Sequence, residues 1–180
     1  EYLKVYGVLV GKKPLIFTNN DSGYETAIEF KKNGVDPIIL DTRKEPKSEI
    51  IDEAKKLDIE IKFSYVVVAA KGYKKVKSAE VAKISDDKNE LGTLENINCD
   101  CICVSGFWTP TIHLASQSGN KTTFNKDIDA FVPGLSKQNE TTLGAANGTF
   151  TLEETLKSSF ETGYELSKKI TNNDNKTSSP

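Results

Sequence analysis

Residues 18–23, Thr-Asn-Asn-Asp-Ser-Gly, have the position of a turn that could hold a dinucleotide. They follow a short apolar run, residues 15–17, and precede apolar residues at helical spacing. The glycine fingerprint of dinucleotide-binding turns would fall on positions 18, 20 and 23, but only Gly23 is a glycine. Asn20 takes the place where the backbone would approach a pyrophosphate. The turn therefore either still binds a pyrophosphate, with Asn20 at the ligand, or keeps the structure of a dinucleotide-binding half without binding the ligand.

Asp41 is the second candidate for a cofactor contact. It closes the next apolar run, residues 38–40, where such folds place an acidic residue that accepts a hydrogen bond from a ribose hydroxyl. Asp21 argues against a phosphate, because it brings negative charge to the start of the predicted helix. We interpret Asp21 and Ser22 as caps of that helix.

A strand–helix–strand unit would position these residues. Strands are predicted at residues 14–18 and 37–41, and the helix between them stops at Asn33-Gly34. A helix capped by Ser48 follows, and a third strand begins near Ile59. Residues 65–97 contain β-rich runs separated by turn residues, a pattern typical of an antiparallel β-meander. The sequence therefore predicts an α/β fold, with a Rossmann-like three-layer core of a parallel sheet and flanking helices, plus the meander.

The domain prediction is a single nucleotide-binding region, residues 1–170. Its parts are a βαβ half (1–64), the meander (65–97), and a returning strand, a glycine-rich turn and a helix (98–170). That turn comprises Gly144, Ala145, Ala146, Asn147 and Gly148. It precedes an amphipathic helix over residues 152–170, which Thr151 and Glu154 should cap. The turn is a candidate for a phosphate or ribose contact, or simply a tight turn into the helix. Residues 171–180 are predicted to form a disordered tail.

Three cysteines and one histidine are the remaining candidates for chemistry. Cys99, Cys101 and Cys103 alternate along a predicted strand, residues 97–104, so they should share one face. Thiols in a row do not form the tetrahedron of a structural zinc site, so we expect buried, reduced cysteines, no disulfide and no metal. His113 has no identifiable partner for catalysis and is interpreted as a structural or helix-start residue. No catalytic residue is predicted.

Composition narrows the classes of partner. The 180 residues carry a formal net charge of -2, so no nucleic-acid partner is expected. No apolar run is long enough to span a bilayer and no signal peptide is apparent, so we expect a cytoplasmic protein with no membrane partner. A start at Glu1 and the absence of Met suggest a piece of a longer polypeptide.

Several strings together resemble the alpha subunits of heterotetrameric sarcosine oxidases. They are Phe-Thr-Asn-Asn-Asp-Ser at residues 17–22, Asp-Thr-Arg at 41–43, Val-Ser-Gly-Phe-Trp-Thr-Pro-Thr-Ile-His-Leu at 104–114, Phe-Val-Pro-Gly at 131–134 and Gly-Ala-Ala-Asn-Gly at 144–148. The resemblance implies an architecture like that of the pyridine-nucleotide-disulfide reductases. It also implies bound NAD, other sarcosine oxidase subunits as partners, and flavin on a partner subunit or at the interface.

The same resemblance implies a function and a set of site residues. The family oxidatively demethylates sarcosine to glycine, with peroxide and a one-carbon product. Ser105, Gly106, Trp108 and the turn at residues 144–148 would contribute to a dinucleotide site that is completed elsewhere. The isolated segment is expected to be inactive. The alternative is a structural or subunit-interaction module whose nucleotide site has decayed.

Overall fold

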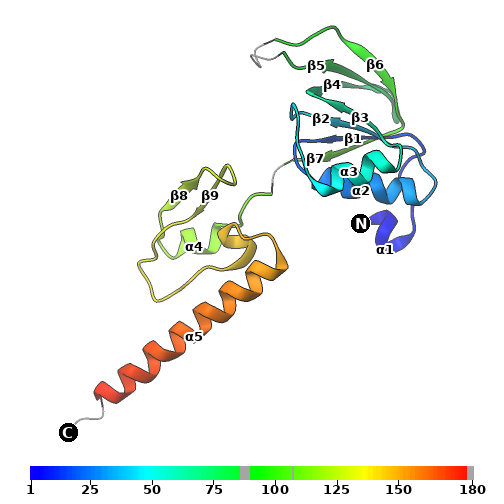
Figure 1. The fold of residues 1–180 in the computed structure, drawn as a ribbon. Coiled ribbons are helices and arrows are strands. Elements are labelled where there is room, and N and C mark those ends of the chain that lie inside the picture. The colour runs from blue at the N-terminus through cyan, green and yellow to red at the C-terminus, as the bar shows by residue number, and fades with distance from the viewer. Residues whose placement is uncertain (86–89, 107, 178–180) are drawn as a thin grey trace. The chain divides into compact units, whose positions relative to one another are not determined.

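A computed structural model of the chain describes residues 1–85, 90–106 and 108–177, with side chains described up to residue 171. The chain divides into two compact units, residues 1–107 and 108–180, each of which is considered by itself (Figure 1). The predicted third part, residues 98–170, is split by this division. Its first strand lies in the first unit and its glycine-rich turn in the second.

The centre of the first unit is a four-stranded parallel sheet. Its order is β3-β2-β1-β7, with β1 Pro14–Thr18, β2 Ile38–Asp41, β3 Glu60–Phe63 and β7 Cys101–Ser105. The register aligns Thr18 with Asp41 on one side and with Ser105 on the other. The candidate residues of three strands therefore meet at one edge, where all the strands end.

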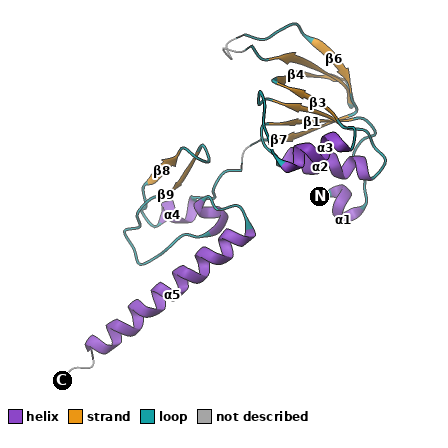
Figure 2. Ribbon diagram, viewed as in Figure 1, coloured by secondary structure: helices purple, strands orange, loops and turns teal. Residues whose placement is uncertain are grey.

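Helices cover one face of this sheet. α2 (Ser22–Lys32) and α3 (Glu49–Lys56) bury their apolar sides against it, and the short α1 (Tyr2–Tyr6) packs on α2 (Figure 2). The core between helices and sheet includes Ile16, Tyr24, Ile39 and Ile51, each of which is essentially inaccessible to solvent. Burial of such apolar area is the dominant force that holds the helices on the sheet.

The third layer is an antiparallel sheet of β4 (Tyr65–Gly72), β5 (Val76–Lys83) and β6 (Glu95–Asn98). Leu15 and Leu40 of the parallel sheet pack on Ala79 and Val81 of β5 in a second core cluster. The predicted α/β fold, with its Rossmann-like core and meander, is confirmed. The face opposite the helices is covered by this meander.

The predicted strand over residues 97–104 was wrong. β6 ends at Asn98 in the antiparallel sheet, and β7 begins at Cys101 in the parallel one. Between them, the Asp100 carboxylate accepts hydrogen bonds from the amides of Lys12 and Lys13, which fix the turn. Two consecutive strands in different layers were predicted as one, because Ile97 near the end of β6 and the partly buried residues of β7 follow one another closely in the sequence.

The second unit contains α4 (His113–Gln117), a hairpin of β8 (Thr122–Asn125) and β9 (Ala130–Pro133), a 3₁₀ turn η1 (Gly144–Asn147) and α5 (Leu152–Thr177). His113 begins α4, as the helix-start interpretation predicted. α5 continues to Thr177, beyond the predicted end of this helix at residue 170. The disordered tail over residues 171–180 stays a prediction, and residues 178–180 lie outside the described part. Among the described helices, none is both long and apolar enough to cross a bilayer.

Candidate functional site

The carboxyl edge of the parallel sheet contains the point where the strand order reverses. From β1 the chain passes through α2 to β2 on one side, while β7 pairs with β1 on the other. Crevices at such switch points are where open α/β sheets bind their ligands. Asn20, Ser105 and Gly106, all predicted site residues, meet at this point.

The Asn20 side chain fills the crevice. Its Nδ2 donates hydrogen bonds to the carbonyl oxygens of Gly106 and of Ser105, the latter at 3.4 Å. Its Oδ1 accepts from the Ser22 amide at 2.9 Å and the Ser22 hydroxyl at 2.6 Å. The amide at the start of α2, which could otherwise bind a phosphate oxygen, is therefore satisfied by the chain itself.

Gly23 keeps the structural role of the third fingerprint glycine. A Cβ at this position would lie 2.6 Å from both Cβ and Oγ1 of Thr18, so α2 can approach β1 this closely only with glycine here. The Thr18 hydroxyl donates to the Asn20 carbonyl at 2.8 Å and holds the turn. The frame of a dinucleotide-binding half is thus present, while its phosphate-binding turn is occupied.

Asp41 is fully buried and engaged by two neighbours. Its Oδ2 accepts from the Tyr24 hydroxyl at 2.7 Å and from Arg43 Nη2 at 2.8 Å, and its Oδ1 accepts from the Arg43 amide at 2.9 Å. Arg43 Nε lies 3.1 Å from Oδ1. A carboxylate offers about four lone-pair positions, so a ribose hydroxyl would have to displace one of these donors.

Arg43 links Asp41 to the turn after β1. Its Nη1 lies 2.8 Å from Asp21 Oδ1, and its guanidinium also pairs with Asp41. Burial alone would lower the pKa of Arg43, but the hydrogen bonds that its guanidinium donates to the two carboxylates raise the pKa above its ordinary value. Asp21 is the N-cap residue of α2, as interpreted from the sequence, but its side chain makes no capping hydrogen bond and pairs with Arg43 instead. Two carboxylates against one guanidinium leave this edge unfavourable for a phosphate.

Tyr24 is a site residue that was not predicted from the sequence, where it belongs only to the apolar spacing of the helix. Burial, followed by the hydrogen bond to Asp41, raises the pKa of its hydroxyl well above the ordinary value, so the group stays protonated and donates. A buried tyrosine usually finds a partner for its hydroxyl. The acidic end of the neighbouring strand was the signal that could have identified that partner.

The second candidate, the turn at residues 144–148, lies in the second unit. Gly144 and Gly148 have φ angles of 64° and 84°, in the region that favours glycine. A Cβ on Gly148 would lie 2.6 Å from Ile128 Cδ1, so this glycine also permits close packing. Between the two glycines, Ala145 and Asn147 are exposed and available to a ligand.

Trp108 lies near this turn within the same unit. Its ring packs on Phe150 with centroids 6.4 Å apart, and Pro110 approaches the position of a Gly148 Cβ. At the start of α5, the Thr151 hydroxyl accepts from the Glu154 amide at 3.3 Å and donates to the Glu154 carboxylate at 2.7 Å, which confirms the predicted cap. The second unit thus brings Trp108 and the glycine turn together.

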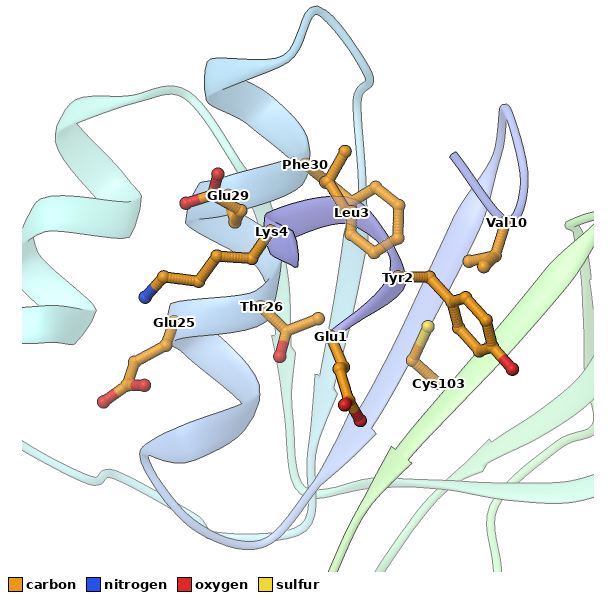
Figure 3. Close-up of a pocket in the computed structure, with 10 residues that line it drawn as sticks. All are labelled: Glu1, Tyr2, Leu3, Lys4, Val10, Glu25, Thr26, Glu29, Phe30 and Cys103. Carbon is orange, nitrogen blue, oxygen red and sulfur yellow. The ribbon is translucent and has the colours of Figure 1, made fainter. Parts of the chain in front are cut away.

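Pockets in the first unit lie away from the filled crevice. One of about 280 Å³ is lined by residues of α1 and α2 and by Cys103 of β7 (Figure 3). Another, of about 420 Å³, lies past the ends of β2 and β3, with Arg43, Ser64 and Val66 in its wall. Arg43 is the link between this second pocket and the Asp41 network. Among the described residues, no group of three or more His, Cys, Asp or Glu could hold a metal ion.

The sequence of the chain was compared with those of known proteins. No family model matches the chain. Over 156 residues, 82% of the chain, it is 35% identical to the sarcosine oxidase subunit alpha of Rhizobium meliloti (strain 1021). Over 164 residues, 90% of the chain, it is 29% identical to the corresponding subunit of Corynebacterium sp. (strain P-1). The chain is similar to a segment of sarcosine oxidase alpha subunits. It spans only 14% and 17% of the length of these two relatives.

The resemblance of the sequence to sarcosine oxidase alpha subunits is thereby confirmed. An alignment of 164 residues is longer than either unit, so the similarity includes both. Among solved structures, the thioredoxin reductase of Lactococcus lactis matches 76% of the chain and 45% of its own, with a TM-score of 0.58 and 16% identity. The thioredoxin reductase of T. acidophilum matches 80% of this chain and 50% of its own chain, with a TM-score of 0.55 and 16% identity. These likenesses establish a reductase-type fold.

Proposed function

We propose that the chain is a segment of a sarcosine-oxidase-type alpha subunit that contributes to binding NAD through its second unit. The complete enzyme, with its other subunits and their flavin, would demethylate sarcosine to glycine and release peroxide. The observation that carries this proposal is the 35% identity to a sarcosine oxidase alpha subunit over 82% of the chain. The fold supports it, because reductase-type folds are built from dinucleotide-binding halves.

The geometry favours the turn at residues 144–148 over the crevice at Asn20. Asn20 and Asp41 have their hydrogen-bonding positions filled by other residues of the chain. Ala145 and Asn147, by contrast, are exposed between two glycines. We therefore assign Asn20 and Asp41 to holding the first unit together, while Ser105 and Gly106 remain predictions for the dinucleotide site.

The charge near the turn indicates which part of a dinucleotide it suits. Glu153 and Glu154 lie in the first turn of α5, and Thr151 already caps the helix. Two carboxylates at a helix N-terminus oppose a phosphate. A ribose hydroxyl can both donate to a carbonyl and accept from an amide, so the turn is better matched to the ribose than to the pyrophosphate.

A titration with NAD followed by amide NMR tests the assignment. We expect weak, saturable shifts at Trp108 and at residues 144–148, with the amides of residues 18–23 unmoved. Asn147→Asp should weaken these shifts, because it adds negative charge beside an anionic ligand. Asn139→Asp is the matched control, since Asn139 is exposed in the same unit. Saturable shifts at residues 18–23 would show that the first unit's turn still binds, and our assignment would be rejected.

A chimera tests the function of the segment in a complete enzyme. The corresponding segment of the Rhizobium meliloti alpha subunit is replaced by this chain, and the chimera is produced together with the other subunits. We expect an assembled enzyme that forms peroxide from sarcosine. Asn147→Asp in the chimera should reduce the NAD content, while Asn139→Asp should not. An assembled enzyme with full NAD content in both variants would contradict a role for the turn.

The alternative function is a structural or subunit-interaction module without a nucleotide. The specific observation in its favour is that Asn20 fills the crevice with its own hydrogen bonds, while Arg43 pairs with both Asp21 and Asp41. It predicts a chimera that assembles and no NAD-dependent shifts in either unit. The two functions therefore differ in the outcome at residues 144–148. The cytoplasmic location remains a prediction from the sequence.

A further inference from the structure

Two of the three cysteines are close neighbours on β7. The Sγ atoms of Cys101 and Cys103 are 3.6 Å apart, and both side chains are partly exposed. The expectation of three buried thiols on one face was therefore wrong. Cys99 alone is buried, and it packs in the cluster on the meander side of the sheet, whereas Cys103 packs on the helix side. The strand break at Asp100 separates Cys99 from the pair.

We propose that Cys101 and Cys103 are a redox modification site that forms a reversible disulfide when the chain meets a peroxide. The sulfur atoms lie in van der Waals contact, so a bond requires them to approach by about 1.6 Å, given a disulfide length of about 2.0 Å. Alternate residues of a strand have Cα atoms about 6.6 Å apart, near the upper limit for a disulfide. The bond would be strained, and strained disulfides are readily reduced.

The position of Cys101 permits the movement that formation of the disulfide needs. It is the first residue of β7, and among the described strands β7 is at the edge of its sheet, paired with β1 alone. Its register partner is Pro14, which has no amide hydrogen to donate to the ladder. Cys103 is held more firmly, in register with Ile16 in the sheet and against the helix-side core. Formation of the disulfide would therefore move Cys101 towards Cys103.

The order of the steps follows from the environment of each sulfur. Burial, and then the neighbouring Cys101, raise the pKa of the Cys103 thiol to about 12, so Cys103 keeps its proton. Cys101, which is partly exposed at the start of β7, reacts first: its thiolate attacks one peroxide oxygen, the O–O bond breaks, a sulfenic acid forms, and the released hydroxide takes up the proton that the Cys101 thiol had lost, giving water. The Cys103 sulfur then attacks the sulfenic sulfur. The S–S bond forms, the S–O bond breaks, and the departing hydroxide takes the Cys103 proton to give the second water. Overall, two thiols lose two electrons and two protons, and one hydrogen peroxide becomes two waters.

Peroxide reaches Cys101 from solvent, because this residue is only partly covered, and its neighbour Cys103 faces a pocket. Cys103 lines the pocket of about 280 Å³ together with Tyr2, Leu3 and Val10 (Figure 3). The proposal does not depend on the proposed function, because the oxidant is supplied in the test. Peroxide is, however, also the product of the activity proposed above.

Thiol counting by mass spectrometry tests the proposal. The reduced chain is treated with hydrogen peroxide, quenched with catalase, denatured and labelled with N-ethylmaleimide. We expect one label in place of three, a loss of two hydrogen masses, and fragment ions that place the label on Cys99. Dithiothreitol should restore all three labels. Three labels after peroxide, or oxygen additions alone, would overturn the proposal.

Three serine variants define the pair. Cys99→Ser, the matched control, should still lose two hydrogen masses and take no label after peroxide. Cys101→Ser should show no such loss. Cys103→Ser should instead leave a sulfenic acid on Cys101, which dimedone traps. A disulfide that persists in Cys101→Ser would assign the chemistry to Cys99 and reject the pair. Far-UV circular dichroism checks that each variant is folded, and the fragment-ion mapping of the unaltered chain decides the question independently of the variants.

Discussion

At the scale of single residues, the most demanding arrangement is the buried contact of Tyr24 with Asp41. A buried carboxylate is tolerated only where charged and hydrogen-bonding partners replace water. Arg43 supplies the charge, and the Tyr24 hydroxyl donates to the same Asp41 oxygen at 2.7 Å. The arrangement ties α2, which carries Tyr24, to the end of β2.

Tyr24→Phe should therefore destabilise the first unit. The variant keeps the apolar ring but removes one donor to a buried carboxylate, which typically costs about 1.5–3 kcal/mol. Urea unfolding followed by circular dichroism measures the change. Tyr73→Phe is the matched control, because Tyr73 is 93% exposed and its loss of a hydroxyl should change the unfolding free energy by less than about 0.5 kcal/mol. Equal effects for the two variants would contradict the role given to the contact.

The same contact predicts a dependence of stability on alkaline pH. The folded-state pKa of Tyr24 is raised, so the unfolded chain loses this proton first. The stabilisation is complete below the ordinary tyrosine pKa of about 10 and falls above it, by at most about 1.4 kcal/mol per pH unit. Lysines titrate in the same range, so the measured quantity is the difference between the original chain and Tyr24→Phe. We expect that difference to shrink as pH rises from 9 to about 11; a constant difference would show that Tyr24 ionises normally.

At the scale of elements, glycines in two helices should respond to the same substitution with opposite signs. Gly23→Ala in α2 places a Cβ 2.6 Å from Thr18, and such overpacking costs about 1–3 kcal/mol. Gly163→Ala in α5 meets nothing within 4 Å and should stabilise its helix by about 0.5–1 kcal/mol, because alanine is the better helix former. Urea unfolding of both variants checks the signs. A neutral Gly23→Ala would mean that α2 does not rest on β1 as closely as described.

At the scale of the whole molecule, α5 displays an apolar stripe. Leu152, Leu156, Phe160 and Tyr164 recur every four residues, and all are exposed, Phe160 at 78%. The spacing places them on one side of the helix. Because these side chains bury little within the chain, they contribute little to its own stability.

Leu156→Gln and Phe160→Gln should each change the unfolding free energy of the isolated chain by less than about 0.5 kcal/mol. Ile51→Ala serves as the contrast, since Ile51 is buried and its truncation should cost about 2–5 kcal/mol. Sedimentation equilibrium on the same samples shows whether a variant alters self-association. A large loss of stability in Phe160→Gln would show that the stripe is covered in solution.

The sequence by itself determined the βαβ frame, the positions of the first three strands along the chain, the cap of α5 and the similarity to sarcosine oxidase alpha subunits. These features rest on local spacing, on residues near one another in the chain, or on strings of residues. The tertiary structure decided what fills the crevice at Asn20 and which donors Asp41 receives, because β1 and β7 lie more than 80 residues apart and their pairing has no local signal. It also divided the apolar run at residues 97–104 between two sheets. A run of covered side chains indicates burial but not the layer that covers it.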